Sequence, residues 1–507
     1  MTTHSSEGAQ LTVQTNDGLM LTRPEPGTHN RSTLFIDGGW RKPGRDAGGL
    51  AVRDAATGAV LGTVPAATPD DLEAAIGAAQ RAQPGWAARP AAERAEQLRR
   101  VHAALAARRQ ELTEIITAEV GTAARMCLAI QVDSALHLLA GAAEVAGSLA
   151  FEERLGNSVV AATPAGIVAA ITPWNYPLFQ TMGKVAAALA AGCAVVHKPS
   201  ELAPLSAFIL AEAFEAAGLP VGVYNLVTGD PVSLGEALAS DPRIDMVSFT
   251  GSTQTGTRVY QLAAASVKRV ALEMGGKSAS VLLADADLSV AVKATVNRAF
   301  LNSGQTCDAW TRLIVPRMML EEVVGRAGPP VSRLTVGDPF DPATRLGPLV
   351  SDRQAERVRR YITGALAGGA AAAYGGPEPP LGLAGGNYVR PTVLTGVRPD
   401  MAVATEEIFG PVLVVLGYET EDEAIALANG TDYGLSGAVW SADSGRALDF
   451  ARRMRAGQVV INGGPYNPLA PFGGVKRSGI GRELGRYGVE EYLEPVAYQL
   501  PAELADD

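Results

Sequence analysis

The sequence predicts an α/β protein that combines a doubly wound parallel-sheet domain, a second α/β domain and a small β arm. Between residues 165 and 273, strands made almost entirely of apolar residues alternate with helical stretches. Such strands are buried on both faces, which is typical of a parallel sheet covered by helices. The chain has 507 residues, too many for one hydrophobic core, so we expect more than one domain.

Composition and charge narrow the class of function. A content of 47% hydrophobic and 19% charged residues fits a soluble globular enzyme. The net charge of −10 argues against nucleic acid or an anionic membrane as a partner. Cys127, Cys193 and Cys307 form no spaced cluster, so we expect neither disulfides nor a metal site, and a cytoplasmic location. We find no uninterrupted apolar run of 18 residues and expect no membrane span.

The first part of the chain predicts packing layers rather than a site. Residues 1–30 are polar and lack a signal pattern, so we interpret them as a mobile tail. A strand and turn follow at 34–40, and a helix begins after the cap Thr68, with further helices to about residue 149. Residues 151–163 predict an extended hairpin arm, a feature that more often joins subunits than binds ligands.

Five apolar strands are then predicted at 165–172, 193–198, 224–229, 244–251 and 268–273, with helices between them. Right-handed crossovers require such strands to form a doubly wound sheet. Ligands of this fold bind beyond the carboxyl ends of the strands. The residues that follow each strand are therefore the candidates for function.

The first two strand ends carry polar groups in stiff turns. PWNYP (173–177) follows the first strand, and its two prolines hold the Asn175 amide in a fixed place. Lys198 and Glu201 follow the second strand and would suit the hydroxyls of a ribose. A surface ion pair explains the same two residues equally well.

The next two strand ends supply glycine and a helix start. Gly229 follows the third strand, and FTGSTQTG (249–256) ends the fourth. There Gly251 opens a turn, and Ser252 with the free N–H groups of the next helix could hold a pyrophosphate. Four such ends on one sheet favour a dinucleotide site.

Cys307 is the candidate nucleophile. It lies in a small and polar run, FLNSGQTCDAWTR (300–312), whose Gly304 lets the backbone turn. A lone Cys is more often a small buried hydrophobic residue, so the residues elsewhere in the chain must show whether Cys307 is a nucleophile. The fifth strand runs into Glu273 and a Gly-Gly turn, and this carboxylate is either a base or a structural cap. None of the five histidines is placed to pair with Cys307, which counts against a Cys-His hydrolase.

Taken together, these segments resemble the aldehyde dehydrogenase superfamily, of the hydrolytic NAD(P)-dependent kind. The similarity covers nearly the whole chain after about residue 32, and eight segments occur in the family's order. They are PWNYP (173–177), KPSE (198–201), FTGSTQTG (249–256), EMGGK (273–277), NSGQTC (302–307), EEIFGPV (406–412), NGTDYGLS (429–436) and PFGGVKRSGIGRELG (471–485).

The resemblance implies three catalytic roles. Cys307 would attack the aldehyde carbon, and Asn175 with the backbone N–H of Cys307 would hold the oxyanion. Glu273 would activate the water that releases the acid, which separates this chain from the CoA-acylating branch of the family. No metal is implied.

The resemblance also implies a cofactor site for NAD, with NADP possible. The carboxylate of Glu201 would repel the 2′-phosphate of NADP, and we therefore expect NAD. The residues implied to bind the cofactor are Thr172, Pro173, Trp174, Lys198, Ser200, Glu201, Gly229, Phe249, Gly251, Ser252, Gly256, Leu272, Gly275, Glu407 and Phe409.

The substrate pocket would include Tyr176, Gly183, Asp308 and Phe472. Gly183 stands where many acetaldehyde-type relatives carry a Trp, so we expect a substrate bulkier than acetaldehyde. Asp308 departs from the family pattern. Its carboxylate would either raise the pKa of the thiol and slow attack, or face the substrate and favour a cationic or polar group.

We expect domains at 31–145 with 164–272 (dinucleotide-binding) and 273–485 (catalytic), and an oligomerisation arm from 146–163 with 486–507. The alternating segment 489–500 resembles the family's intersubunit strand, which implies a homodimer or homotetramer. The alternatives are an NADP-using semialdehyde dehydrogenase, an esterase using the same Cys, and a catalytically silent scaffold or binding protein of the same fold.

Overall fold

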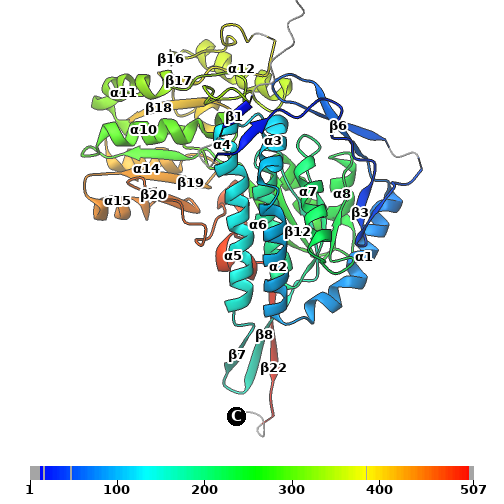
Figure 1. The fold of residues 1–507 in the computed structure, drawn as a ribbon. Helices are drawn as coiled ribbons and strands as arrows, with labels where there is room; N and C mark the ends of the chain where they lie inside the picture. Colours follow the sequence, from blue (N-terminus) through cyan, green and yellow to red (C-terminus); the bar gives the residue numbers. More distant parts are fainter. Residues whose placement is uncertain (1–11, 15–17, 46–47, 384, 502–507) are drawn as a thin grey trace, which may run out of the picture.

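The computed structural model describes residues 12–14, 18–45, 48–383 and 385–501, and it contains two large sheets (Figure 1). The first sheet has eight strands in the order β21 (Gly479–Ile480), β13 (Arg269–Met274), β12 (Met246–Gly251), β9 (Ile167–Ile171), β10 (Ala194–Lys198), β11 (Tyr224–Leu226), β3 (Leu34–Ile36) and β4 (Gly39–Arg41). Strands β13, β12, β9, β10 and β11 run parallel, as predicted.

Helices cover both faces of this sheet because its strands are apolar on both sides. Along β9, Val168 and Ala170 pack into one cluster with α2 (Ala91–Ala106), α5 (Ser134–Ser148), α6 (Pro177–Ala191) and α7 (Leu205–Ala216). The alternate residues Ala169 and Ile171 pack into the opposite cluster with α1 (Pro69–Ala87), α8 (Ser233–Ser240) and α9 (Thr253–Ala264). Successive side chains of a strand point to opposite faces of the sheet, so each strand contributes alternate residues to the two helical layers.

The second sheet has seven strands in the order β16 (Ala371–Tyr374), β17 (Thr392–Thr395), β18 (Val412–Tyr418), β15 (Arg312–Pro316), β14 (Ala279–Leu282), β19 (Ser436–Trp440) and β20 (Gln458–Ile461). One face packs on α10 (Leu288–Ala299) and α11 (Leu320–Ser332), and the other packs on α12 (Asp352–Ala367), α14 (Glu421–Asn429) and α15 (Ser444–Ala451). This second α/β unit confirms the predicted fold class.

The shorter elements connect and flank the sheets. They are β1 (Thr12–Gln14), β2 (Met20–Thr22), β5 (Gly49–Arg53), β6 (Val60–Pro65), α3 (Arg109–Val120), α4 (Ala124–Cys127), η1 (Leu128–Asp133), η2 (Leu301–Gly304), η3 (Arg317–Met319), α13 (Ala402–Thr405), η4 (Lys476–Ser478) and α16 (Gly485–Glu490).

The predicted mobile tail needs a correction. Residues 18–30 are described and lie against the protein, where Leu21 of β2 is fully buried beside Leu61 and Phe340. The backbone N–H of Thr22 also donates to the Glu114 carboxylate at 2.9 Å. The tail prediction is therefore wrong for residues 18–30, because burial of one apolar side chain anchors a segment whose composition is polar. Residues 1–11 and 15–17 lie outside the described residues.

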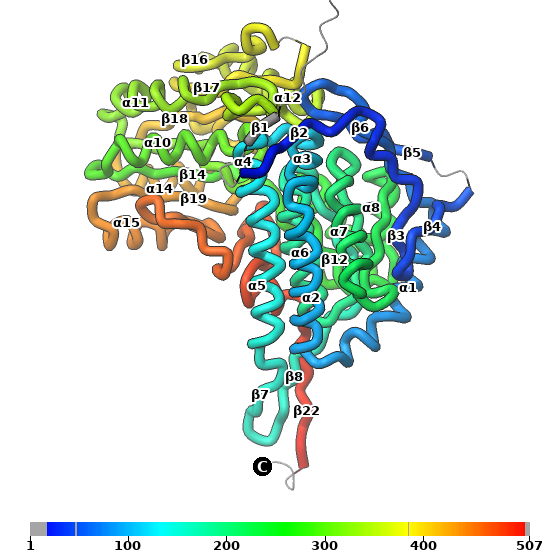
Figure 2. Tube along the Cα trace, in the orientation of Figure 1, coloured from blue at the N-terminus to red at the C-terminus, as the bar shows by residue number. Residues whose placement is uncertain are grey.

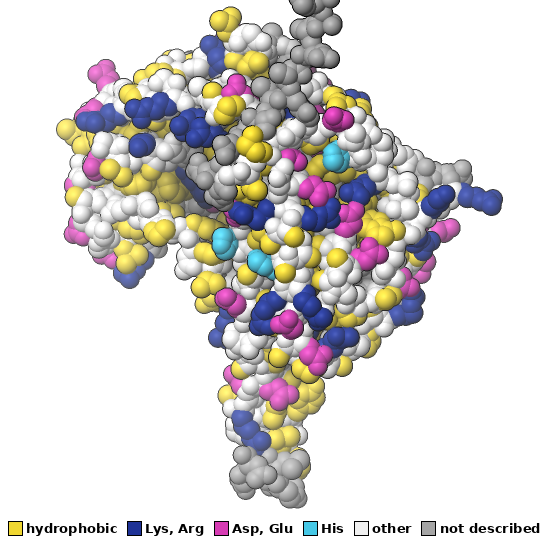
Figure 3. All heavy atoms as spheres, viewed as in Figure 1, with side chains coloured by type: hydrophobic (Ala, Val, Ile, Leu, Met, Phe, Trp, Pro, Cys, Tyr) yellow, Lys and Arg dark blue, Asp and Glu magenta, His cyan; other side chains and the backbone are white. Residues whose placement is uncertain are grey.

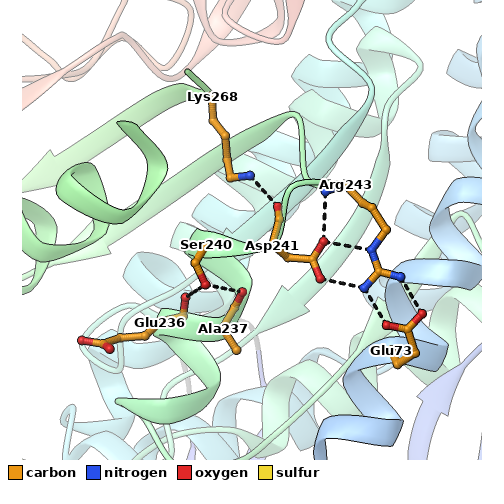
Figure 4. Close-up of polar contacts among 7 residues, drawn as sticks. All are labelled: Glu73, Glu236, Ala237, Ser240, Asp241, Arg243 and Lys268. Carbon is orange, nitrogen blue, oxygen red and sulfur yellow. Dashed lines mark hydrogen bonds and ion pairs between the residues drawn. The ribbon is translucent and has the colours of Figure 1, made fainter. Parts of the chain in front are cut away.

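The predicted cap of the first helix is confirmed as a reciprocal capping box. The Thr68 hydroxyl accepts from the Asp71 backbone N–H, and the Asp71 carboxylate accepts from the Thr68 N–H at 2.9 Å. Arg243 holds α1 to the end of α8 (Figure 4). Its guanidinium donates to both oxygens of Glu73 at 2.5 and 2.6 Å and to both oxygens of Asp241 at 2.9 and 2.7 Å. These bonds connect helix α1 to the loop between α8 and β12.

The arm is a three-stranded antiparallel sheet that projects from the body (Figures 1 and 2). It consists of β7 (Glu152–Leu155), β8 (Ser158–Pro164) and the C-terminal β22 (Leu493–Gln499), which pairs with β8 along its whole length. The hairpin predicted at 151–163 and the strand predicted within 489–500 therefore lie side by side. The domain boundaries stay a prediction.

One helical segment is more apolar than we expected. By length and hydropathy alone, residues Ala124–Ser148 could cross a membrane, a test that a buried core helix also passes. Within it α5 packs between α2 and α6, as a core helix does.

On the face shown in Figure 3, basic and acidic side chains are interspersed.

Candidate functional site

A cavity of about 200 Å³ lies between the two large sheets and brings Cys307, Asn175 and Glu273 together. Asn175 follows β9, Glu273 lies in β13, and Cys307 follows the turn after α10. The three side chains come from distant parts of the chain, and the ends of β9 and β13 hold two of them on one edge of a sheet. The predicted catalytic residues thus meet in space.

An unusual turn positions Cys307. Asn302, Ser303 and Gly304 all have positive φ angles of 51°, 57° and 75°. Only a glycine fits at 304, because an added Cβ would lie 2.2 Å from the backbone carbon of Gly410. Three consecutive left-handed residues reverse the chain directly after a helix. This reversal returns Cys307 towards the cavity.

Hydrogen bonds fix Asn175 against the same turn. The side-chain amide of Asn175 donates to the Gln305 backbone carbonyl at 3.1 Å. The backbone carbonyl of Asn175 accepts from the side-chain amides of Asn302 at 3.0 Å and Gln131 at 2.9 Å. A primary amide carries two N–H groups, so one donor remains beyond the bond to Gln305. Asn175 can therefore donate to a group bound beside Cys307.

Glu273 is a buried carboxylate without a hydrogen bond. Its side chain is 3% exposed, and neither oxygen has a partner among the described residues. Burial raises the pKa of Glu273 well above its usual range, and the neighbouring Glu483 adds to the rise, while Lys184 opposes it. A carboxyl group with a raised pKa is a suitable general base.

Sequence reasoning missed the ion pair beside Glu273. Lys184 of α6 is fully buried and forms an ion pair with Glu483, which is also buried. The signal for Lys184 was present, since a lone cation in an otherwise apolar helix needs a partner. The identity of that partner was not readable, because Glu483 lies 299 residues further along the chain.

Burial also raises the pKa of Cys307 well above its usual range, and the charges of Asp308, Glu273 and Glu407 add to the rise. Asp308 forms an ion pair with Arg298, another residue that sequence reasoning missed. The hydroxyl of Tyr176 shares a hydrogen bond of 2.9 Å with the hydroxyl of Thr306, the residue before Cys307. The Asp308 carboxylate therefore has a guanidinium partner, Arg298, in addition to the neighbouring Cys307 thiol.

A loop from the second unit closes the other side of the cavity. The Glu407 carboxylate accepts from the Gly276 N–H at 3.2 Å, and burial raises its pKa to about 7. The Phe409 ring meets Trp174 edge-on, with ring centroids 5.5 Å apart. Gln354 and Arg357 of α12 hold this loop through its carbonyls at 2.8 and 2.7 Å, two further residues that sequence reasoning missed.

A larger cleft of about 950 Å³ adjoins the cavity and shares Trp174, Ser252 and Glu407 with it. The N-terminus of α9 opens into this cleft, and Ser252 caps it by accepting from the Thr255 N–H at 3.2 Å. The free N–H groups of a helix start can hold phosphate oxygens. The cleft is therefore large enough, and suitably lined, for a dinucleotide.

The predicted cofactor residues divide into three groups. Those that line the cavity or cleft are Pro173, Trp174, Gly251, Ser252, Gly275, Glu407 and Phe409. Phe249 and Leu272 are instead core residues beneath them, and Gly256 leaves room for the Met274 side chain. The other predicted residues lie at or after strand ends, namely Thr172, Lys198, Ser200, Glu201 and Gly229. Lys198 is buried, and burial lowers its pKa.

The predicted substrate residues do not all share one cavity. Phe472 lines the cavity of Cys307. Gly183 lines a separate, smaller cavity of about 40 Å³ beside α5, and an added Cβ there would lie 3.2 Å from the Glu483 carboxylate. The expectation that Gly183 widens the site therefore has no direct support from its position.

Comparison with known proteins settles the family. The model of the aldehyde dehydrogenase family matches residues 40–497. The chain belongs to the aldehyde dehydrogenase family. It is thus an oxidoreductase that acts on the aldehyde group, and the resemblance in the sequence is confirmed.

Individual relatives are similar over nearly their whole length. A 3-succinoylsemialdehyde-pyridine dehydrogenase from Pseudomonas sp is 45% identical over 462 residues, which cover 91% of this chain and 97% of that protein. A mutant of aldehyde dehydrogenase C from Pseudomonas syringae, solved with NAD+ and octanal, has a TM-score of 0.92 and 44% identity, covering 95% and 99% of the two chains. A Mycobacterium tuberculosis aldehyde dehydrogenase with NAD+ has a TM-score of 0.91 and 39% identity, covering 94% and 99%.

Proposed function

We propose that this chain oxidises an aldehyde bulkier than acetaldehyde to its carboxylic acid, with Cys307 as nucleophile and NAD as hydride acceptor. The observation that carries the proposal is the meeting of Cys307, Asn175 and Glu273 in one cavity beside a dinucleotide-sized cleft. A thiol, an amide donor and a base are the groups that aldehyde oxidation through a thioester requires.

In the first step the Cys307 thiolate attacks the carbonyl carbon of the aldehyde. A carbon–sulfur bond forms, and the carbonyl oxygen becomes an oxyanion in a thiohemiacetal. The remaining amide N–H of Asn175 and the backbone N–H of Cys307 would stabilise that oxyanion, at about 3–4 kcal/mol for each donor. Both donors come from segments that the hydrogen bonds around Asn302 and Gln305 hold in place.

The cleft suits NAD through residues from both large sheets. The start of α9 at Ser252 would face the pyrophosphate, and Glu407 would accept from the nicotinamide ribose. Gly275 lies against the Glu407 carboxylate, where an added Cβ would come within 2.1 Å of an oxygen, so a side chain would displace Glu407. A bound NAD would supply the acceptor for the hydride of the thiohemiacetal carbon, and a thioester would then remain on Cys307.

Glu273 then releases the acid. Its carboxylate takes a proton from a water molecule as that water attacks the thioester carbon, and the carbon–sulfur bond breaks to regenerate the Cys307 thiolate. The raised pKa of Glu273, caused first by burial, favours this proton transfer. The buried ion pair of Lys184 and Glu483 lies beside it.

For cofactor choice we propose NAD over NADP, because the carboxylate of Glu201 would repel a 2′-phosphate. Two similar proteins were solved with NAD+, which supports this choice. The alternative is an NADP-using semialdehyde dehydrogenase. The name of one relative, which acts on a pyridine-bearing semialdehyde, favours the semialdehyde part of that alternative.

The substrate proposal rests on relatives as well as on residues. Octanal in one similar structure and a pyridine semialdehyde in the name of another relative are both larger than acetaldehyde. Phe472 offers an aromatic wall to the cavity of Cys307, and the Tyr176 hydroxyl bonds the adjacent Thr306. We therefore expect long or aromatic aldehydes to be preferred.

The test is the formation of NADH by the purified chain with a panel of aldehydes, with NAD and NADP compared. We expect the highest kcat/KM with NAD and a long or aromatic aldehyde. A clear preference for acetaldehyde would refute the substrate proposal. Absence of NADH with every aldehyde would refute the dehydrogenase, and ester hydrolysis in that case would favour the esterase.

Replacement of the nucleophile gives the matched test. Cys307→Ala should abolish NADH formation and leave NAD binding intact, whereas Cys127→Ala should preserve turnover, since Cys127 is buried away from the cavity. Turnover by Cys307→Ala would show that the nucleophile is wrong. If the native chain shows no turnover either, the result would favour a catalytically silent scaffold or binding protein.

We also propose a homodimer or homotetramer formed through the arm. Strand β22 pairs with β8 on one side, and among the described residues no strand pairs with its other edge. An open edge of this kind can add a strand of a second copy. Light scattering should give the mass of two or four chains, and the mass of one chain would contradict the proposal.

A further inference from the structure

Asp308 directly follows the nucleophile, and its carboxylate is buried. The residue is 5% exposed and forms an ion pair with Arg298. Arg298 lies in the last turn of α10, ten residues earlier in the chain. The left-handed turn at 302–304 lies between the two and reverses the backbone, which lets the guanidinium reach the residue after Cys307.

A lone carboxylate at this position would hinder the chemistry of Cys307. Like charges that lie close together disfavour ionisation, and the effect grows when water is excluded. The negative groups that act on the thiol are Asp308, Glu273 and Glu407, and each raises its pKa. Arg298 acts in the opposite direction and lowers it. The site thus holds several acids and needs a nearby cation.

The two phenols that face the pair come from two further segments. Tyr176 at the start of α6 and Tyr466 after β20 are both influenced by Asp308 and Arg298, and burial is the main reason that their pKa values are raised. Neither phenol supplies a positive charge. The pKa of Arg298 is raised, first by Asp308, so this guanidinium stays charged throughout the working pH range.

We propose that Arg298 is a positioning residue that pairs with Asp308 and so keeps an uncompensated negative charge from acting on Cys307. The proposal rests on the role of Cys307 as nucleophile. It also decides between the two readings of Asp308, because a carboxylate already paired with a guanidinium offers no net charge to a cationic substrate. Arg298 retains further N–H donors, and its buried Nε has no partner among the described residues.

The test measures thiol reactivity rather than turnover. The full chain without cofactor is treated with iodoacetamide over a range of pH, and alkylation of Cys307 is followed by mass spectrometry of its peptide. The buried thiols Cys127 and Cys193 serve as internal controls for unfolding. The midpoint of the rate against pH reports the ionisation of Cys307.

The variants form a cycle of charge removal. Arg298→Gln should raise the midpoint by about one pH unit and Asp308→Asn should lower it by about as much, as expected for one nearby charge. The double variant loses both charges and should lie near the native midpoint, because the opposite effects of the two groups on the thiol cancel. Arg298→Lys keeps the charge and should remain near the native midpoint.

Two outcomes would overturn the proposal. One is an unchanged midpoint in both single variants, and the other is a double variant whose midpoint stays as high as that of Arg298→Gln. If Arg298→Gln fails to fold, Asp308→Asn decides alone, and a midpoint that does not fall refutes the role. Retained turnover in Cys307→Ala would instead refute the proposed nucleophile, which is a separate result from the alkylation cycle.

Discussion

Replacement of Glu273 by Gln separates the two halves of the proposed reaction. The side chain is 3% exposed and makes no hydrogen bond among the described residues, so an amide of the same size removes no native partner and leaves no cavity. We therefore expect the variant to fold and to bind NAD as the native chain does. Only the capacity to take a proton from water is lost.

The expected magnitude follows from that single loss. A general base contributes about 10²–10⁴-fold to a rate, and here it acts only on thioester hydrolysis. Attack by Cys307 and hydride transfer precede that step. Glu273→Gln should therefore form one NADH per active site rapidly and then turn over about 10²–10⁴-fold more slowly than the native chain.

Rapid mixing with detection of NADH measures the burst, and mass spectrometry of the intact chain identifies the thioester on Cys307. Glu119→Gln is the matched control, because Glu119 is another buried carboxylate with an unpaired oxygen but lies outside the cavity. It should show native turnover. An unchanged steady rate in Glu273→Gln, or slow NADH formation without a burst, would refute the role of Glu273.

The pH dependence of hydrolysis has a definite sign. A base works only when deprotonated, and burial raises the pKa of Glu273, so the hydrolytic rate should rise as pH increases through that raised value. In Glu273→Gln this rising limb should disappear from the steady rate. A limb that persists unchanged would assign it to another group.

Three further changes test other parts of the site. Asn175→Ala should lower kcat by about 10²–10³-fold through loss of an oxyanion donor, with NAD binding unchanged when it is followed by quenching of tryptophan fluorescence. Glu201→Gln should raise the kcat/KM ratio of NADP over NAD roughly fivefold, since a screened charge contact is worth about 1 kcal/mol, and an unchanged ratio would remove Glu201 from cofactor selection. Gly304→Ala places a Cβ 2.2 Å from the Gly410 backbone at a φ of 75° and should cost about 2–4 kcal/mol, which lowers the melting temperature. Gly364→Ala, where an added Cβ meets nothing within 4 Å, is its control and should melt at or slightly above the native temperature.

The elements of the first sheet were predictable because their signals are local. Runs such as AGIVAAIT (165–172) and IDMVSFTG (244–251) are apolar on both faces, and β9 and β12 lie within them. The Thr68 cap was readable for the same reason, since its partner Asp71 lies three residues away. By contrast, the short strand at Met20–Thr22 was missed, because one buried Leu21 in a polar stretch gives no periodic signal.

The sequence by itself determined the family, the alternation of strands and helices, the residue types at the strand ends, including Asn175 and Glu273, and the candidate nucleophile Cys307. These features follow from short-range periodicity, turn chemistry and the order of motifs. Only the tertiary structure decided which charges compensate one another. Lys184 meets Glu483 across 299 residues, and Arg298 meets Asp308 only because a left-handed turn reverses the chain between them. Buried charges need partners, and three-dimensional packing alone selects those partners.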